Sequence, residues 1–262
     1  MIYKAISAHN AFTTKIVSNL GFDFVWASSL EVSTSFCLPD ASIVTFDTIK
    51  SVVEHMVRVS AKPIIVDCDS GYGNEVNTLY ALKDLKKIGV HAICIEDNIF
   101  PKQNSFYEGT RKLEDKDVFC NKIRIAKKIF NDNNDIIIAR TEALIQGMSQ
   151  REALNRSLAY IKSGANYILP HSKKTNVNEL LTFARSWNKY APIVAVPSTY
   201  SSATAKELEE AGVKIVIYAN HTIRTIKKAL ETTLPKILIS GRTHEIEGEI
   251  SPLKEILKYY EN

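Results

Sequence analysis

Apolar and polar positions alternate in blocks along this chain. Short runs rich in valine, isoleucine and alanine recur, and each is followed by a longer segment whose apolar residues have helical spacing. This pattern is typical of parallel strands that are covered by helices. The short runs predict eight strands, at residues 3–8, 22–26, 63–67, 92–96, 135–140, 167–170, 192–197 and 214–218.

The segments between these runs predict the helices. Several of them end at a glycine, such as Gly21, Gly89 or Gly164, and glycine readily takes the left-handed conformation that ends a helix. The predicted helices cover residues 12–20, 48–59, 75–88, 115–130, 150–163, 177–187, 203–211 and 223–232. Eight strands alternating with helices predict a single domain over residues 1–262, an α/β fold of the (β/α)8 TIM-barrel type.

The end of the chain departs from this alternation. Residues 234–248 are irregular and polar, and residues 251–260 begin Ser-Pro-Leu-Lys-Glu, a favourable helix start. We therefore expect an additional C-terminal helix. Its apolar residues, including Leu253 and Leu257, share one face, which would pack on its own barrel or, by exchange, on a neighbouring subunit.

Composition narrows the class of protein. The chain has 262 residues, 45% of them hydrophobic, which is enough to bury the core of one barrel. The formal net charge of +4 arises from 33 basic and 29 acidic residues scattered along the sequence, so no basic stripe indicates a nucleic-acid partner. No apolar run approaches the roughly 18 residues of a membrane span, so we expect neither membrane insertion nor secretion. The four cysteines lack metal-ligand spacing and fit reduced thiols in a cytoplasmic protein.

Two connections are too long to be simple turns. Residues 27–47 follow the second predicted strand, and residues 97–114 follow the fourth. Both leave the carboxyl end of a strand, which is the end at which barrel enzymes carry their catalytic groups. We expect the polar residues at or just beyond the strand ends to share this rim. They are His9, Trp26, Ser28, Asp67, Asp69, Glu96, Asp97, Arg140, Glu142, His171, Asn220 and His221.

Carboxylates form the strongest pattern on the predicted rim. Asp67 and Asp69 lie two positions apart at the end of a strand, so their side chains can point the same way, and Glu96 ends the next strand. Three carboxylates favour a hard cation, most simply Mg²⁺ held partly through water, with Mn²⁺ as a substitute. The alternative is that the two aspartates only cap the glycine-containing turn that follows.

Two basic side chains complete the pattern. Arg140 ends an apolar strand, where a charge is costly unless it faces an anionic substrate or a carboxylate. A structural ion pair with Glu142 or Glu96 is the alternative. His171 follows a strand directly; a lone histidine there is more often structural, and only its neighbours on the rim suggest a role.

Several segments resemble one known family. The matching motifs are Ser7-Ala8-His9-Asn10, residues 26–33, residues 67–74, Glu96-Asp97 with Phe100-Pro101-Lys102 and Asn104-Ser105, Ala139-Arg140-x-Glu142-Ala143, residues 171–174, and Ala219-Asn220-His221. In this order, and at strand ends, they are similar to the phosphoenolpyruvate mutase group of the isocitrate lyase superfamily. The chain departs from that group at Asn98, where lysine is usual, and at Ser29, where glycine is common.

The resemblance implies a reaction and roles for individual residues. The reaction is the Mg²⁺-dependent interconversion of phosphoenolpyruvate and phosphonopyruvate, which forms a carbon–phosphorus bond for phosphonate biosynthesis. Asp67 would carry the metal, with Asp40, Asp69 and Glu96 assisting through water. The substrate would contact Trp26, Ser28, Ser29, Leu30 and Arg140, and the catalytic residues would be Asp40, Lys102, Asn104, Ser105, Arg140 and His171. Asp40 would either position the phosphoryl group or accept it, and Lys102, Asn104 and Ser105 would lie on a loop that closes over the substrate.

Three other functions compete with the mutase. Phosphonopyruvate hydrolase shares nearly every motif, but the position of Asn104 resembles threonine there, so Asn104 favours the mutase. Carbon–carbon lyases of the superfamily carry Lys-x-Cys-Gly-His in this loop, and the segment Lys102-Gln103-Asn104-Ser105 has no thiol. A non-catalytic metabolite-binding barrel would not need the full set of charged residues.

The resemblance also implies partners. Family members resemble tetramers in which paired subunits exchange the C-terminal helix, so we expect a homo-oligomer. Because the mutase equilibrium favours phosphoenolpyruvate, a separate decarboxylase would act downstream on the phosphonopyruvate.

Overall fold

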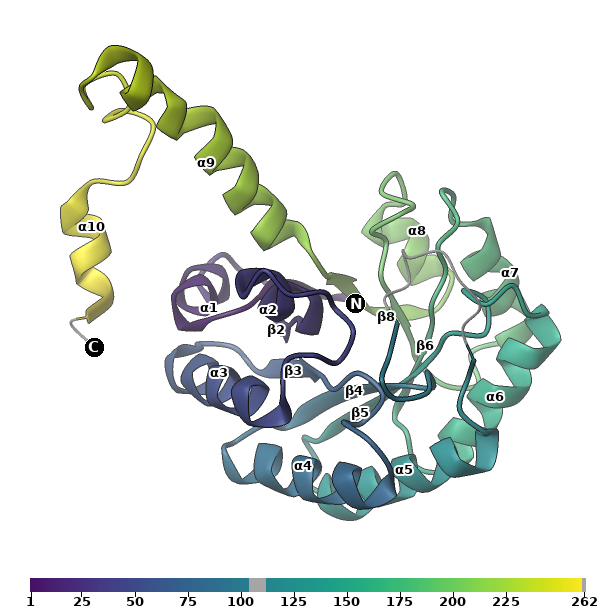
Figure 1. The fold of residues 1–262 in the computed structure, drawn as a ribbon. Coiled ribbons are helices and arrows are strands. Elements are labelled where there is room, and N and C mark those ends of the chain that lie inside the picture. The colour runs from purple at the N-terminus through teal and green to yellow at the C-terminus, as the bar shows by residue number, and fades with distance from the viewer. Residues whose placement is uncertain (104–111, 261–262) are drawn as a thin grey trace. The chain divides into compact units, whose positions relative to one another are not determined.

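The structure, a computed structural model, describes residues 1–103 and 112–260 of the chain. Its strands are β1 Tyr3–Ala8, β2 Phe24–Ala27, β3 Ile64–Asp67, β4 Ala92–Glu96, β5 Ile136–Thr141, β6 Tyr167–Pro170, β7 Ile193–Ala195 and β8 Val213–Tyr218. Each strand pairs in parallel with the next, and β8 pairs with β1, which closes the barrel (Figure 1). The (β/α)8 barrel predicted from the sequence is confirmed. The strand β7 is shorter than predicted because Pro192 and Pro197, which lack a backbone N–H, lie outside it.

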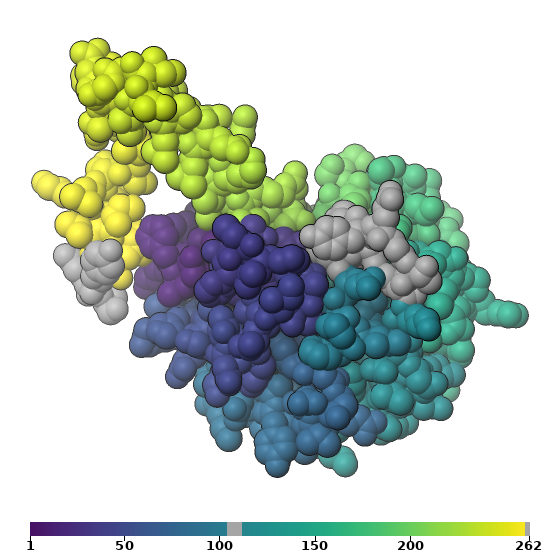
Figure 2. Space-filling view, in the orientation of Figure 1, coloured from purple at the N-terminus to yellow at the C-terminus, as the bar shows by residue number. Residues whose placement is uncertain are grey.

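Helices connect the strands. They are α1 Ala11–Ser18, α2 Ser29–Ser35, α3 Phe46–Val59, α4 Glu75–Lys87, α5 Lys116–Ile129, α6 Gln150–Lys162, α7 Asn178–Trp187 and α8 Ala205–Glu210. In the space-filling view the surface of this part of the chain changes colour in chain order, from purple through blue to teal and green (Figure 2). The barrel and these helices make up one compact unit, Met1–Asn220, called unit 1 here.

Strand residues alternate between two apolar layers. Residues that point into the barrel pack on one another, and their neighbours in sequence pack between the strands and the helices. Ile65, Cys94 and Ile138 belong to the inner layer, whereas Val66 and Ile93 belong to the outer one. This alternation decides which residue at each strand end faces the centre of the rim.

The connection after β2 contains a helix that the sequence pattern did not predict. α2 is seven residues long, and its first backbone N–H groups are capped by Ser28, whose Oγ accepts a hydrogen bond from the N–H of Glu31. Glu31 is fully buried, and its carboxylate accepts a hydrogen bond from Ser7 Oγ at 2.7 Å. A buried carboxylate bound to β1 thus fixes α2 at the rim.

The C-terminal unit, His221–Asn262, contains the expected additional helix. Its elements are α9 His221–Ser240, α10 Leu253–Leu257 and the 3-10 helix η1 Lys258–Tyr260. The predicted end of the helix near Thr232 is wrong, because α9 continues through Pro235 to Ser240. A proline removes one backbone hydrogen bond, and the later bonds, including Gly241 N to Ile237 O at 2.8 Å, keep the helix intact. In the described part of the chain, no helix combines the length and the apolar character that crossing a bilayer requires.

Candidate active site

A small cavity of about 70 Å³ opens at the carboxyl ends of the strands. The alternation of strand residues explains which side chains reach it. A residue two positions beyond an inner-layer residue also points toward the barrel axis. Those residues are Ser28, Asp67, Glu96, Arg140 and His171, and all of them line the cavity.

Lys102 is the centre of one group of contacts. Its ammonium lies 2.8 Å from Asp40 Oδ1 and 2.5 Å from Asp69 Oδ1, and it donates to Ser29 Oγ at 3.0 Å. Only 5% of the residue is exposed. Burial alone would lower the pKa of Lys102, but Asp69 and Asp40 raise it well above its usual range, so the side chain is a fixed cation.

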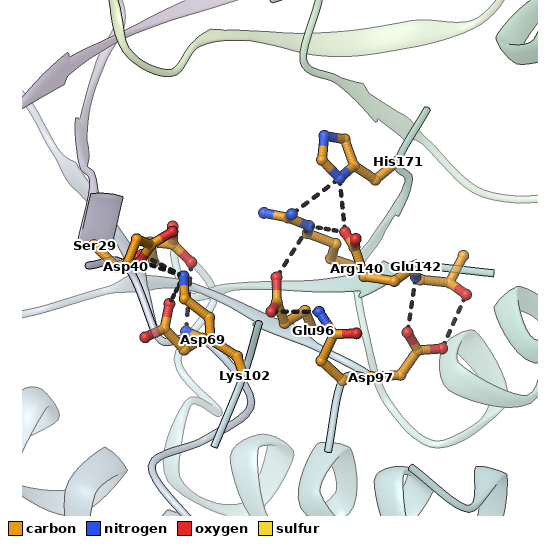
Figure 3. Close-up of polar contacts among 12 residues, drawn as sticks. Ser29, Asp40, Asp69, Glu96, Asp97, Lys102, Arg140, Glu142 and His171 are labelled. Carbon is orange, nitrogen blue, oxygen red and sulfur yellow. Dashed lines mark hydrogen bonds and ion pairs between the residues drawn. The ribbon is translucent and has the colours of Figure 1, made fainter. Parts of the chain in front are cut away.

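Ser29 joins this group to Asp67. Its Oγ donates to Asp67 Oδ2 at 2.9 Å. The same Oγ accepts a hydrogen bond from Lys102 (Figure 3). A glycine at this position would have no such contact. The departure from the family pattern at Ser29 therefore adds a hydroxyl bridge between Asp67 and Lys102.

The turn after β3 carries Asp69 in an unusual backbone conformation. The strand ends at Asp67, and Asp69 has a φ of 48°, so strand alternation does not orient its side chain as the sequence pattern suggested. The turn brings it to Lys102 instead. Burial raises the pKa of Asp69 to about 6, although Lys102 acts in the opposite direction. Its Oδ1, although close to Lys102 Nζ, accepts no hydrogen bond of ordinary geometry.

Arg140 is the centre of the second group. Its Nε lies 2.5 Å from Glu142 Oε1 and 3.2 Å from Glu96 Oε2, and its Nη2 lies 2.9 Å from His171 Nδ1 (Figure 3). Burial alone would lower the pKa of Arg140, but Glu142 and Glu96 raise it well above its usual range. The ion pairs with Glu142 and Glu96, which the sequence left open as a structural alternative, are therefore both present. Arg140 also lines the cavity, where an anion could reach it.

Glu96 lies between the two groups. It accepts a hydrogen bond from Asn98 Nδ2 at 2.8 Å, in addition to the ion pair with Arg140. Burial raises the pKa of Glu96 to about 8, against the effect of Arg140 and Lys102. Asn98, where the family usually has lysine, thus supports a carboxylate of the site through an amide rather than a charge.

His171 contacts both partners through one nitrogen. Its Nδ1 lies 2.7 Å from Glu142 Oε1 and 2.9 Å from Arg140 Nη2. Burial lowers the pKa of His171, and Arg140 adds to that effect, so the ring is neutral at pH 7. A neutral Nδ1 either donates to Glu142 or accepts from Arg140, and each contact corresponds to one tautomer. The tautomer that accepts from Arg140 keeps its proton on Nε2, as a donor for an anion.

The carboxylates fit a hydrated Mg²⁺ ion. Asp67, Asp69 and Glu96 supply hard oxygen donors, and Asp69 has a buried oxygen without a regular hydrogen bond. The ligand atoms of these three residues do not all lie within 4.8 Å of one another. Among the described residues, a different cluster of possible metal ligands meets that spacing. A cation here would therefore contact part of the set directly and the rest through water.

That other cluster, His91, Asp132 and Asp135, lies at the opposite end of the barrel, before β4 and β5. The ammonium of Lys86 lies inside it, 2.7 Å from Asp135 Oδ1 and 2.8 Å from Asp132 Oδ2. Lys86 thus joins these side chains into one ion network, away from the cavity at the carboxyl ends of the strands.

The structure places most of the predicted site residues together. Around the cavity lie Trp26, Ser28, Leu30, Asp40, Asp67, Glu96, Lys102, Arg140, His171 and Asn220; Ser29 and Asp69 contact Lys102. Asn104 and Ser105 lie outside the described residues. Asp97, expected on the rim, is fully buried. It follows the inward-facing Glu96 directly, so its side chain points to the opposite side of the strand, toward the helices. Ser198 and Thr199, which also line the cavity, were missed although they directly follow a predicted strand.

The fold and this rim of buried, paired charges define a (β/α)8-barrel enzyme. The chain matches the phosphoenolpyruvate phosphomutase family over residues 2–238, and it belongs to that family. A phosphonopyruvate hydrolase from Variovorax sp. (strain Pal2) is 35% identical over 259 residues, which cover 98% of this chain and 89% of the relative. The chain is thus an enzyme of the phosphoenolpyruvate mutase/isocitrate lyase superfamily.

Solved structures show the same relationship. The crystal structure of a phosphoenolpyruvate phosphomutase from Streptomyces platensis subsp. rosaceus has a TM-score of 0.96 and 38% sequence identity, and the match covers 99% of this chain and 91% of that one. A phosphonopyruvate hydrolase in complex with oxalate and Mg²⁺ has a TM-score of 0.92 and 34% identity, with 99% and 90% covered. Mutase and hydrolase relatives are therefore about equally similar to this chain.

Proposed function

We propose that this enzyme is a phosphoenolpyruvate mutase, which interconverts phosphoenolpyruvate and phosphonopyruvate. The observation that carries the proposal is a pair of buried cations beside one small cavity. Lys102 pairs with Asp40 and Asp69, and Arg140 pairs with Glu96 and Glu142, next to a cavity that Asp67 also lines. Such a site can hold a doubly anionic metabolite between fixed positive charges. The segment from Lys102 to Ser105, which has mutase-like asparagine at position 104, favours the mutase among the reactions of the superfamily.

The chain's own residues perform distinct tasks in this proposal. In the direction from phosphonopyruvate, the carbon–phosphorus bond breaks, its electron pair becomes the enolate of pyruvate, and the phosphorus–oxygen bond to that enolate oxygen forms. Arg140 and His171 hold anionic groups of the substrate, and Lys102 stabilises charge on the phosphoryl group beside Asp40. Exclusion of water from the cavity prevents hydrolysis of the reactive phosphoryl group.

Mg²⁺ is part of this proposal, with Mn²⁺ as its substitute. Asp67 would hold the ion directly, and Asp69, Glu96 and Asp40 would hold it through water. When bound, the ion supplies positive charge that stabilises the enolate oxygen.

Phosphonopyruvate hydrolysis is the second candidate function. It is favoured by the 35% identity to the Variovorax hydrolase, because this chain is about as similar to hydrolases as it is to mutases. The same cavity would then admit a water molecule to the phosphoryl group, and the products would be pyruvate and phosphate.

Incubation of phosphonopyruvate with the enzyme and Mg²⁺ separates these reactions. Following the mixture by ³¹P NMR, we expect the signal of phosphoenolpyruvate to replace that of phosphonopyruvate. Accumulation of inorganic phosphate would instead identify the hydrolase. An unchanged spectrum would contradict both functions.

The same assay without metal is its control. We expect exhaustive chelation with EDTA to abolish turnover and added Mg²⁺ to restore it. Full activity after chelation would contradict the assignment of Asp67, Asp69 and Glu96 to a metal.

The C-terminal unit supports the proposal of a homo-oligomer with an exchanged helix. Leu238, Ile239 and Leu253 are 88%, 86% and 71% exposed, and such side chains are typical of surfaces that pack on another subunit. We expect light scattering to show a dimer or tetramer, and the double variant Leu238→Glu, Ile239→Glu to be smaller. A monomeric parent chain would contradict this proposal.

The mutase would work in the cytoplasm beside a separate decarboxylase. Its equilibrium favours phosphoenolpyruvate, so a reaction that consumes phosphonopyruvate is needed to draw material toward phosphonates.

A further inference from the structure

A lysine of α5 lies buried behind the site. Lys122 is 0% exposed and lies on the same helix face as the apolar residues Phe119, Ile123 and Ala126. Lysine is almost never fully buried unless its ammonium is paired. The Nζ of Lys122 donates to the carbonyl oxygen of Ser70 at 2.9 Å and to Glu114 Oε2 at 3.0 Å. These contacts reach inward from the helix layer to two segments of the rim.

The first segment is the turn that carries the carboxylates of the site. Ser70 follows Asp69 directly, and φ is positive at Asp69, Gly71, Tyr72 and Gly73. Positive φ at Asp69 and Tyr72 is energetically unfavourable and persists only where surrounding contacts enforce it. The hydrogen bond from Lys122 to the Ser70 carbonyl is such a contact, in the middle of this turn.

The second segment returns from the rim to α5. The backbone N–H of Glu114 donates to the carbonyl of Asp97 at 2.8 Å, and Arg156 Nη1 donates to the carbonyl of Glu114 at 3.1 Å. The carboxylate of Asp97 is fully buried and accepts from the N–H of Glu142 at 2.8 Å and from the hydroxyl of Tyr160 at 2.7 Å. Through Glu114 and Asp97, the contacts of Lys122 continue to the backbone of Glu142, the residue that holds Arg140 and His171.

We propose that Lys122 is a positioning residue, which fixes the turn of Asp67 and Asp69 relative to the Glu114–Asp97 support of the rim. The inference rests on the proposed metal role of those carboxylates. Groups that orient metal ligands from behind typically change metal affinity about 10- to 100-fold when they are removed. Lys122 would not contact the ion itself. It binds the backbone carbonyl of Ser70, which directly follows the proposed ligand Asp69.

The test compares two buried or half-buried lysines. Lys122→Met retains most of the side-chain volume among apolar neighbours and removes the ammonium. Lys86→Met is the matched control, because Lys86 pairs with Asp132 and Asp135 at the opposite end of the barrel. By isothermal titration of the substrate-free enzyme with MgCl₂, we expect about 10-fold weaker binding for Lys122→Met and unchanged binding for Lys86→Met.

Two further measurements test the same role of Lys122. Amide hydrogen exchange should accelerate at Gly71 and Glu114 in Lys122→Met, but not in Lys86→Met. Glu114→Gln, which keeps the fold of α5 while removing the counter-charge, should weaken Mg²⁺ binding in the same direction. Parental Mg²⁺ affinity in folded Lys122→Met, or an equal loss in Lys86→Met, would overturn the inference. A parent enzyme that binds no Mg²⁺ would overturn the proposed function instead, and exchange at Gly71 and Glu114 would then decide the positioning role alone.

Discussion

Replacing Lys102 with methionine is expected to lower kcat about 100- to 1,000-fold, the range found when one fixed electrostatic donor is removed from an active site. The ammonium lies within 2.8 Å of Asp40 and 2.5 Å of Asp69 and is shielded from solvent, so its charge acts at close range. Methionine fills a similar volume without that charge. Initial rates of phosphonopyruvate conversion, followed by ³¹P NMR, measure the effect.

Lys87→Met is the control for this change. Lys87 is exposed on α4 and pairs only with a surface carboxylate among the contacts described, so its loss should leave kcat unchanged. Circular dichroism must show that both variants are folded. A folded Lys102→Met enzyme with the parental rate would remove Lys102 from the mechanism.

Replacing Arg140 with methionine is expected to reduce both activity and stability. The guanidinium faces Glu142 and Glu96, which are 0% and 2% exposed, and removal of one partner from a buried ion pair typically costs about 3–5 kcal/mol. We expect kcat to fall about 1,000-fold, because an anion-binding charge at the cavity is lost as well. Urea unfolding and the ³¹P assay measure the two effects separately.

Two other substitutions complete the comparison: Arg140→Lys separates charge from geometry, and Arg124→Met is the surface control. Arg140→Lys keeps a cation but lacks the planar fork that reaches Glu142, Glu96 and His171 together, so it should restore part of the stability and little of the turnover. Arg124→Met, on the exposed face of α5, should change the unfolding free energy by less than about 0.5 kcal/mol. Equal stability of Arg140→Met and the parent would mean that the buried carboxylates do not depend on Arg140.

The barrel could be predicted because its strands are buried on both faces and therefore appear as continuous apolar runs. The rim followed from the strand ends, and the inner-layer direction of Asp67, Glu96 and Arg140 can be read from the register of each run. Asp97 was assigned to the rim with Glu96 although adjacent strand residues point to opposite sides. Applying the alternation strictly would have assigned Asp97 to the helix layer.

Other features could not be predicted because they depend on contacts between distant segments. The cation of Lys122 occupies a position on α5 at which the helical period alone indicates an apolar residue, and its partners are 52 and 8 positions away. The pairing of Lys102 with Asp40 joins two long connections whose paths no local pattern determines. α2 was missed for a different reason, since its Ser28–Glu31 cap was visible in the sequence but its seven residues are too few for a clear period.

The alternation of inner and outer layers has an evolutionary consequence. Side chains that face the cavity and side chains that support them from the helices occupy different positions in the sequence, even where they are neighbours, as Glu96 and Asp97 are. A substitution at a cavity position can therefore alter the chemistry without removing a support, and a support can be retained while the reaction changes. A single barrel divided in this way allows descendants to diverge in substrate while they inherit the same scaffold.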